Sequence, residues 1–246
     1  MGTIRRSVIK PRPKLQSSQG GLLVAIVGGD GSGKTTVIDD LCTWFSTHLK
    51  TTKFHLGKPS WSWQTTIVRG ILKIGQLLGL YTFSKEPIPY TIDATNDSTP
   101  DYPRLFRAVC TAYDRYQTYV KARRYASNGG LVICDRYPLP QVMFMDGPQC
   151  ERIAGNPQAG WLVKKLIKLE MKYYNQIRPP DLLIVLKVKP ETAVQRKVDE
   201  DEASVRTRST IVWETDWTQI SAHVIDANHS KEEVLSEAKF LIWSRV

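Results

Sequence analysis

The chain has 246 residues, of which 34 are Lys or Arg and 24 are Asp or Glu, so its formal net charge is +10. A hydrophobic fraction of 41% and a charged fraction of 24% are typical of a globular protein, which excludes global disorder. No window approaches 18 uninterrupted apolar residues, so the sequence predicts no membrane-spanning helix. The excess charge indicates an anionic partner, and nucleic acid, phosphate compounds and a membrane surface all remain open.

Half of the excess charge lies in residues 1–20, which carry five Lys or Arg and no acid. Prolines, serines and a glycine in the same stretch predict a flexible basic leader, followed by one domain over residues 21–246. A transit peptide is the alternative, although Pro11 and Pro13 oppose an amphipathic helix. No secretory segment follows and the four cysteines form no C-x-x-C pair, so we expect a cytoplasmic protein.

Apolar runs alternate with longer amphipathic stretches, a pattern typical of a parallel sheet with crossover helices. The expected strands cover residues 22–27, 53–56, 131–134, 182–187 and 222–225. The expected helices cover residues 34–50, 65–79, 104–127, 158–177, 190–197 and 231–243. Prolines, glycines and polar residues break residues 81–103 and 136–157, so we expect irregular connections there, near the strand ends where such folds bind ligands.

The strongest motif is GGDGSGKT at residues 28–35, a full match to G-x-x-x-x-G-K-[ST]. It follows an apolar run and opens an amphipathic helix, which is the context that a phosphate-binding loop requires. Its backbone N–H groups and the positive end of the helix would hold phosphate groups, so we expect ATP and Mg²⁺ as ligands. The expected nucleotide-binding residues are Gly28, Asp30, Gly31, Ser32, Gly33, Lys34, Thr35 and Thr36.

Charged and hydroxyl side chains in and after this motif have separate expected roles. Lys34 would bridge the β- and γ-phosphates and Thr35 would ligate Mg²⁺. Asp135 ends an apolar strand and would hold the same metal, while Arg136 would clamp a phosphate, a structural Asp–Arg pair being the alternative. Asp30 places a carboxylate beyond the γ-phosphate, or else caps the turn.

Together with VICDRY at residues 132–137, the phosphate loop resembles the thymidylate kinase family of nucleoside monophosphate kinases. Three further segments are similar to that family, at residues 112–117, 180–196 and 224–234. The resemblance covers about residues 21–243. It implies an α/β fold, the three-layer sandwich of P-loop NTPases. A five-stranded parallel sheet would have helices on both faces and a lid over about residues 197–218. It also implies a possible homodimer.

The same resemblance implies Mg²⁺-dependent transfer of the ATP γ-phosphoryl group to a nucleoside monophosphate, most of all thymidylate. In that family the loop carboxylate contacts the acceptor sugar, so the resemblance implies that role for Asp30. In the same way, Arg136 would contact the acceptor phosphate, and Arg115 would contact the acceptor base or phosphate. The loop itself lacks an arginine, so Arg206 and Arg208 in the lid would supply the catalytic charge, unless they are surface charge. The expected catalytic residues are therefore Lys34, Arg136, Arg206 and Arg208.

The acceptor side departs from the family pattern. Residues 57–59 read Gly-Lys-Pro where the family has Arg-Glu-Pro, and Thr111 stands where a Phe often stacks on thymine. Lys58 can still meet a phosphate, as a point charge. Residues 138–148 are also rewritten and contain Gln141, a further candidate. The expected acceptor-binding residues are Asp30, Lys58, Arg115, Arg136 and Gln141.

These departures keep other functions open. One is phosphoryl transfer to a different acceptor, such as a sugar or a lipid-linked metabolite, and another is an ATP-binding regulatory protein that transfers nothing. Nucleic acid is not an expected partner, because no recognition motif is present. Trp61 and Trp63 beside Lys58 would either stack on an acceptor ring or cover the core.

Overall fold

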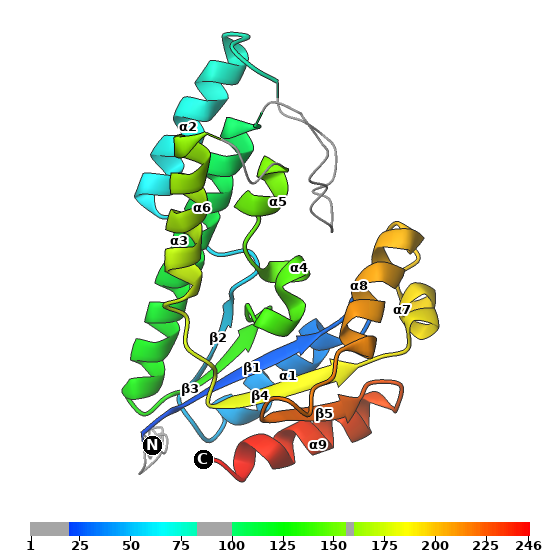
Figure 1. Ribbon diagram of the computed structural model, residues 1–246. Coiled ribbons are helices and arrows are strands. Elements are labelled where there is room, and N and C mark those ends of the chain that lie inside the picture. Colours follow the sequence, from blue (N-terminus) through cyan, green and yellow to red (C-terminus); the bar gives the residue numbers. More distant parts are fainter. Residues whose placement is uncertain (1–19, 83–99, 156–159) are drawn as a thin grey trace, which may run out of the picture.

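The computed structural model describes residues 20–82, 100–155 and 160–246, shown in Figure 1. The leader predicted for residues 1–20 lies outside this part except for Gly20, as does most of the connection predicted for residues 81–103. Among the described residues, no helix is both long enough and apolar enough to span a bilayer.

A five-stranded sheet forms the centre of the fold. Its strands are β1 (Leu22–Gly28), β2 (Thr51–His55), β3 (Leu131–Asp135), β4 (Leu182–Lys187) and β5 (Ala222–Asp226). They run parallel in the order β2-β3-β1-β4-β5, so the predicted α/β fold class is confirmed. β1 pairs with β3 on one side and β4 on the other. The segment after β1 therefore emerges at the middle of the carboxyl edge, where such sheets bind ligands.

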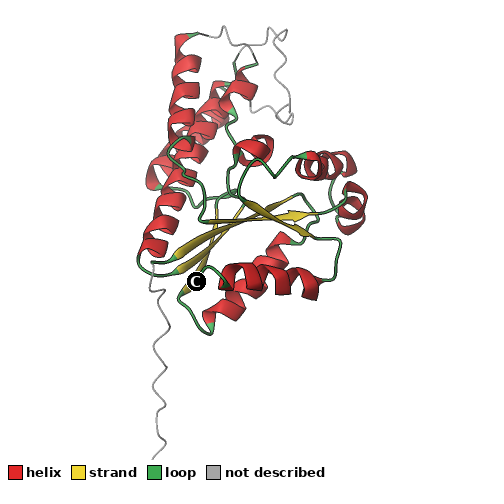
Figure 2. Cartoon of the chain, turned by 60° about the horizontal axis from the view of Figure 1, so that its bottom comes forward, coloured by secondary structure: helices red, strands yellow, loops and turns green. Residues whose placement is uncertain are grey.

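Helices cover both faces of this sheet, as Figures 1 and 2 show. The helices around the sheet are α1 (Lys34–Ser46), α2 (Trp63–Leu77), α3 (Tyr102–Ser127), α6 (Trp161–Tyr174), α7 (Pro190–Arg196), α8 (Glu202–Glu214) and α9 (Lys231–Trp243). Helices α1 and α9 pack on one face. Helix α3 packs on the other and carries α2 and α6 on its outer side. The result is the expected three-layer sandwich of P-loop NTPases.

Alternating side chains of β1 build the two apolar layers. Val24 and Ile26 pack with Phe45 of α1 on one face, whereas Leu23 and Val27 lie in the layer under α3. All four β1 side chains are buried, because a central parallel strand is covered on both faces. This packing holds the end of β1, and thus the phosphate loop, on a rigid base.

Most element boundaries lie within three residues of the prediction, although α1 ends at Ser46 and not at residue 50. Residues 136–157 were predicted irregular, but they contain η1 (Pro140–Val142), α4 (Met143–Asp146) and α5 (Cys150–Ala154). Buried Glu170 of α6 accepts the N–H groups of Gln149 and Cys150 at 2.9 and 2.8 Å. This carboxylate fixes the start of α5 from 20 residues away, so a local pattern of prolines and glycines could not predict it.

The segment predicted as the lid, residues 197–218, contains helix α8. Its N-cap is Asp201, whose carboxylate accepts the N–H of Ser204 at 2.8 Å. Helix α8 packs against α7, and the two lie beyond the carboxyl end of β4 (Figure 1). Asp201 in the predicted lid is therefore a helix cap, and Arg206 and Arg208 lie within the helix that it caps.

Candidate functional site

The phosphate loop after β1 is packed closely against α7 and α8. Gly31 has φ +71°, and a Cβ placed on it would lie 2.8 Å from the Cα of Ala193. A Cβ on Gly29 would lie 2.8 Å from the Cα of Ser209. Both approaches require glycine, so the glycines allow the loop to turn and also let the two helices contact it.

Lys34 is buried inside the loop that precedes it. Its Nζ donates hydrogen bonds to the carbonyl oxygens of Gly28 at 3.0 Å and Gly29 at 2.6 Å. Burial, and secondarily the charge of Arg136, lowers the pKa of this ammonium to about 8. The lysine is thus held by neutral carbonyl acceptors and is poorly solvated. A phosphate bound beside it would stabilise its charged form.

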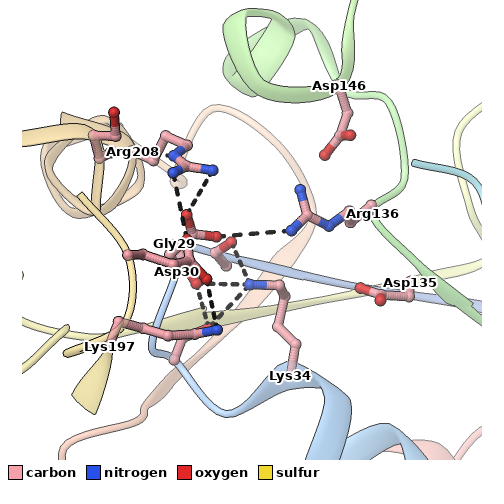
Figure 3. Close-up of polar contacts among 12 residues, drawn as sticks. Gly29, Asp30, Lys34, Asp135, Arg136, Asp146, Lys197 and Arg208 are labelled. Carbon is pink, nitrogen blue, oxygen red and sulfur yellow. Dashed lines mark hydrogen bonds and ion pairs between the residues drawn. The ribbon is translucent and has the colours of Figure 1, made fainter. Parts of the chain in front are cut away.

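Asp30 places its carboxylate between two arginines, as Figure 3 shows. Its Oδ2 lies 2.9 Å from a guanidinium nitrogen of Arg208, and its Oδ1 lies 3.8 Å from one of Arg136. The residue is only 5% exposed, and its backbone oxygen accepts a hydrogen bond from the Ser209 hydroxyl at 3.1 Å. Cations from α8 and from the end of β3 therefore meet over the phosphate loop.

The structure separates the two candidate arginines of α8. Arg208 contacts Asp30 and also lies 3.5 Å from Glu200. Arg206 contacts Glu202 at 2.9 Å and Glu191 at 3.5 Å, and its side chain is nearly half exposed. The two residues lie about 200° apart around a helix, so only one of them can face the loop.

Arg136 adopts an unusual backbone conformation, with φ +52°, the one positive value among the described residues other than glycine. Such a conformation is sparsely populated for arginine and is found at functional sites. Gly57 makes room for it, because a Cβ there would lie 2.4 Å from Arg136 Cδ and 3.0 Å from an Asp146 carboxylate oxygen. Gly57, which stands where the resembling family has arginine, is thus a steric requirement of this arrangement.

Asp135 and Thr35 are suited to a divalent cation. Asp135 Oδ1 is buried and has no hydrogen-bond partner, while Oδ2 lies 3.6 Å from His55 Nε2. Thr35 lies in the first turn of α1, directly after Lys34. Among the described residues, no group of three or more His, Cys, Asp or Glu could hold a metal ion. An orphaned carboxylate oxygen and one hydroxyl fit Mg²⁺, which takes few protein ligands and completes its shell with water and phosphate.

Asp146 is a site residue that the sequence reasoning missed. It ends α4 and lines a small cavity together with Gly28, Lys34 and Arg136. Burial raises the pKa of its carboxyl group, although the neighbouring Arg115 opposes that shift. In Figure 3 its carboxylate faces Arg136. No motif marks it, and the only local signal was its position in a segment rewritten relative to the resembling family.

The structure places Arg115, predicted to contact the acceptor, among backbone groups. Its Nε donates to Leu56 O at 2.7 Å, and its terminal nitrogens donate to the carbonyls of Gly57 and Asp146 and to Tyr174 Oη. It also lies 3.6 Å from an Asp146 carboxylate oxygen and is 3% exposed. These contacts join the ends of β2 and α4 to α3 and α6, so this side chain holds the four segments together.

The remaining predicted residues lie further out. Lys58 is exposed after β2, with its backbone N–H donated to His55 Nδ1, and Gln141 lies in η1, partly exposed. Thr36 is exposed in the first turn of α1, whereas Ser32 is buried and donates to Gly29 O at 2.8 Å. The structure therefore brings together the loop, Arg136 and Arg208, and does not show Lys58 or Gln141 in contact with them.

Two known proteins are similar to this chain over most of their length. It is 29% identical over 224 residues to the uncharacterized ATP-binding protein YghR of Escherichia coli strain K12, covering 88% of this chain and 85% of that protein. It is 28% identical over 223 residues to the uncharacterized ATP-binding protein YghS of the same strain, covering 87% and 89%. No protein-family model matches the chain. The similarity extends over the domain as a whole and is not confined to the phosphate loop.

Proposed function

We propose that this protein is a Mg²⁺-dependent phosphotransferase. It would move the γ-phosphoryl group of ATP to a small phosphorylated acceptor, in first place the nucleoside monophosphate thymidylate. The observation that carries the proposal is the convergence of Lys34, Arg136 and Arg208 around Asp30 at the carboxyl edge of the sheet. A protein that only binds a nucleotide has no need of arginines from two sides, whereas phosphoryl transfer does. The names of the relatives support ATP as the nucleotide.

The chain's own residues would act by positioning and by charge. The loop's N–H groups and Lys34 would hold the β- and γ-phosphates. Lys34 would give up its hydrogen bonds to the carbonyls of Gly28 and Gly29 and bind the phosphate oxygens in their place. Arg208 would move from Asp30 to the transferring group, where negative charge is spread over three oxygens. Thr35 and Asp135 would hold Mg²⁺, which supplies charge neutralisation for the phosphates when bound.

On the acceptor side, Arg136 is the best-placed cation. It contacts the loop carboxylate, and Gly57 leaves room for its bent backbone. Lys58 and Gln141 would contact the acceptor from the exposed rim of the site. Arg115 would support the base of the site through its contact with Asp146. The homodimer implied by the family resemblance belongs to the same proposal.

A second candidate keeps the chemistry and changes the acceptor to a hydroxyl compound, such as a sugar. Asp146 favours it, since a buried carboxylate of raised pKa in the same cavity as Lys34 and Arg136 could accept the proton of an attacking hydroxyl. A phosphate acceptor would not need such a base.

The decisive experiment is an ADP-release assay with Mg·ATP and a panel of acceptors. The panel contains thymidylate, the other monophosphates, the corresponding nucleosides and simple sugars. Lys34→Met should abolish turnover, whereas Lys231→Met should not, because Lys231 is an exposed lysine that pairs with Asp40. Asp146→Asn separates the candidates: it should lower turnover at least tenfold with a hydroxyl acceptor and only slightly with a monophosphate.

Binding of Mg·ATP is measured separately, by thermal shift. Stabilisation by Mg·ATP without ADP release from any acceptor would leave a nucleotide-binding regulatory protein. Absence of any Lys34-dependent shift would contradict the proposal as a whole.

A further inference from the structure

Helix α2 carries an apolar surface that faces away from the fold. We define the apolar stripe as Trp63, Ile67, Ile71, Ile74 and Leu78. These residues recur every three or four positions, so they share one face of the helix. Each is between 50% and 70% exposed. A run of large apolar side chains on one exposed helix face marks an interaction site, because isolated exposed residues do not align in this way.

The opposite face of the helix explains why the stripe stays largely exposed among the described residues. Thr65 is buried against α3, and the backbone N–H of Ser62 donates to Asp114 of α3 at 3.0 Å. Ser62 also caps α2 by accepting the N–H of Thr65. The helix is therefore fixed on α3 by its polar side. Figure 1 shows it at the outer edge of the helical layer, away from the sheet.

A cationic groove runs beside the stripe, between α2 and α3. It measures about 520 Å³, and its charged lining residues are Arg69, Lys73 and Arg107, with no acid among the described ones. The Arg69 guanidinium lies 4.1 Å from the centre of the Trp61 ring, and its Nε is buried without a hydrogen-bond partner. Arg69 and Lys73, together with this unused buried donor, favour an anionic ligand.

The sequence around α2 also carries a positive net charge. No Asp or Glu occurs between Asp40 and Glu86, whereas six Lys or Arg do. On the neighbouring helices α3 and α6, the acids Asp114 and Glu170 are buried and so do not offset the surface charge. A second copy of this chain would bring its own unbalanced cations to the same face, whereas an anionic surface would neutralise them.

We propose that α2 docks on an anionic lipid bilayer. The apolar stripe would enter the boundary between headgroups and acyl chains, and Arg69 and Lys73 would contact the lipid phosphates in the groove. A helix with Trp and aliphatic residues on one face, cations beside them and no acid is suited to lying in a membrane interface. This inference is independent of the proposed transfer reaction.

The test is flotation of the full chain with vesicles. Vesicles of phosphatidylcholine with 30% phosphatidylglycerol should carry the protein, and vesicles of phosphatidylcholine alone should carry at least tenfold less. The double variant Ile71→Ser, Ile74→Ser should lose binding at least tenfold, because two aliphatic side chains leave the interface. Arg69→Gln with Lys73→Gln should lose binding and its dependence on salt.

Matched variants elsewhere control for exposed apolar and charged residues in general. Phe240→Ser removes a 72% exposed side chain from α9, and Lys164→Gln removes an exposed cation from α6, so both should bind as the wild type does. No flotation of the wild type, or equal loss in the controls, would overturn the proposal. A dimer in light scattering that dissociates in the Ile71→Ser, Ile74→Ser variant, without vesicle binding, would also overturn it by assigning the stripe to a second copy.

Discussion

The phosphate-loop region and the proposed acceptor region of this protein differ in how their charged groups are held. Around the loop, Lys34, Asp30 and Arg208 contact one another or the loop backbone within hydrogen-bonding or ion-pair distance. On the acceptor side, Arg115 is bound to the backbone and Lys58 is exposed on the rim. The cations around the loop are therefore gathered at one point but already paired within the protein, whereas those on the proposed acceptor side are held by structural contacts or exposed.

We expect the strongest loss of activity from a substitution in α8, on the phosphate-loop side of the site. Arg208→Ala should lower the rate of γ-phosphoryl transfer about 1,000-fold, because an arginine that meets the transferring group contributes on that scale. Arg206→Ala is the matched control and should change the rate less than threefold, since that side chain contacts Glu191 and Glu202. Single-turnover kinetics with saturating Mg·ATP measures both, and equal losses would show that neither arginine is specific to the reaction.

A substitution at Gly57 tests the close approach between Gly57 and Arg136, which joins the two regions. Gly57→Ala should force Arg136 to move, because the new Cβ would lie 2.4 Å from its Cδ. We expect a loss of stability of about 1–3 kcal/mol, together with a raised KM for the acceptor and unchanged affinity for ATP. Thermal unfolding and steady-state kinetics measure these quantities. Gly70→Ala is the control, since a Cβ there meets nothing within 4 Å, and it should not destabilise the protein.

The smallest expected effect concerns the pH dependence of ATP binding. In the protein without nucleotide, burial lowers the pKa of Lys34 to about 8. A bound triphosphate would raise that pKa because it favours the charged form. Affinity should therefore be constant below pH 8 and fall by up to about tenfold per pH unit above it. Calorimetry in two buffers of different ionisation enthalpy should show proton uptake near pH 8.5. Lys34→Arg should remove this slope, because arginine does not titrate in that range.

The strand, turn and helix of the phosphate-loop region could be predicted because the sequence signal for them is local. Eight consecutive residues carry the backbone turn, the lysine and the hydroxyl, and the apolar run before them is the central strand. The sheet could also be predicted, since buried parallel strands leave continuous apolar runs. The choice between Arg206 and Arg208 could not, because it depends on which side of α8 faces the loop.

The acceptor side could not be predicted because its contacts join distant segments. Arg115 binds carbonyl groups that are 31 to 59 residues away in the chain, and Glu170 caps a helix 20 residues away. Asp146 became a site residue only through these contacts. Spacing within a motif carries no information on such long-range hydrogen bonds.

The position of Asp30 between Arg136 and Arg208 makes the site comparable to an ion exchanger. An internal anion already occupies the two arginines, so an external anion must displace it in order to bind. A monovalent ion gains little from that exchange, whereas a triphosphate brings several charges and can neutralise both arginines and Lys34 at once. The loop carboxylate would thereby favour highly charged phosphate esters over inorganic salt.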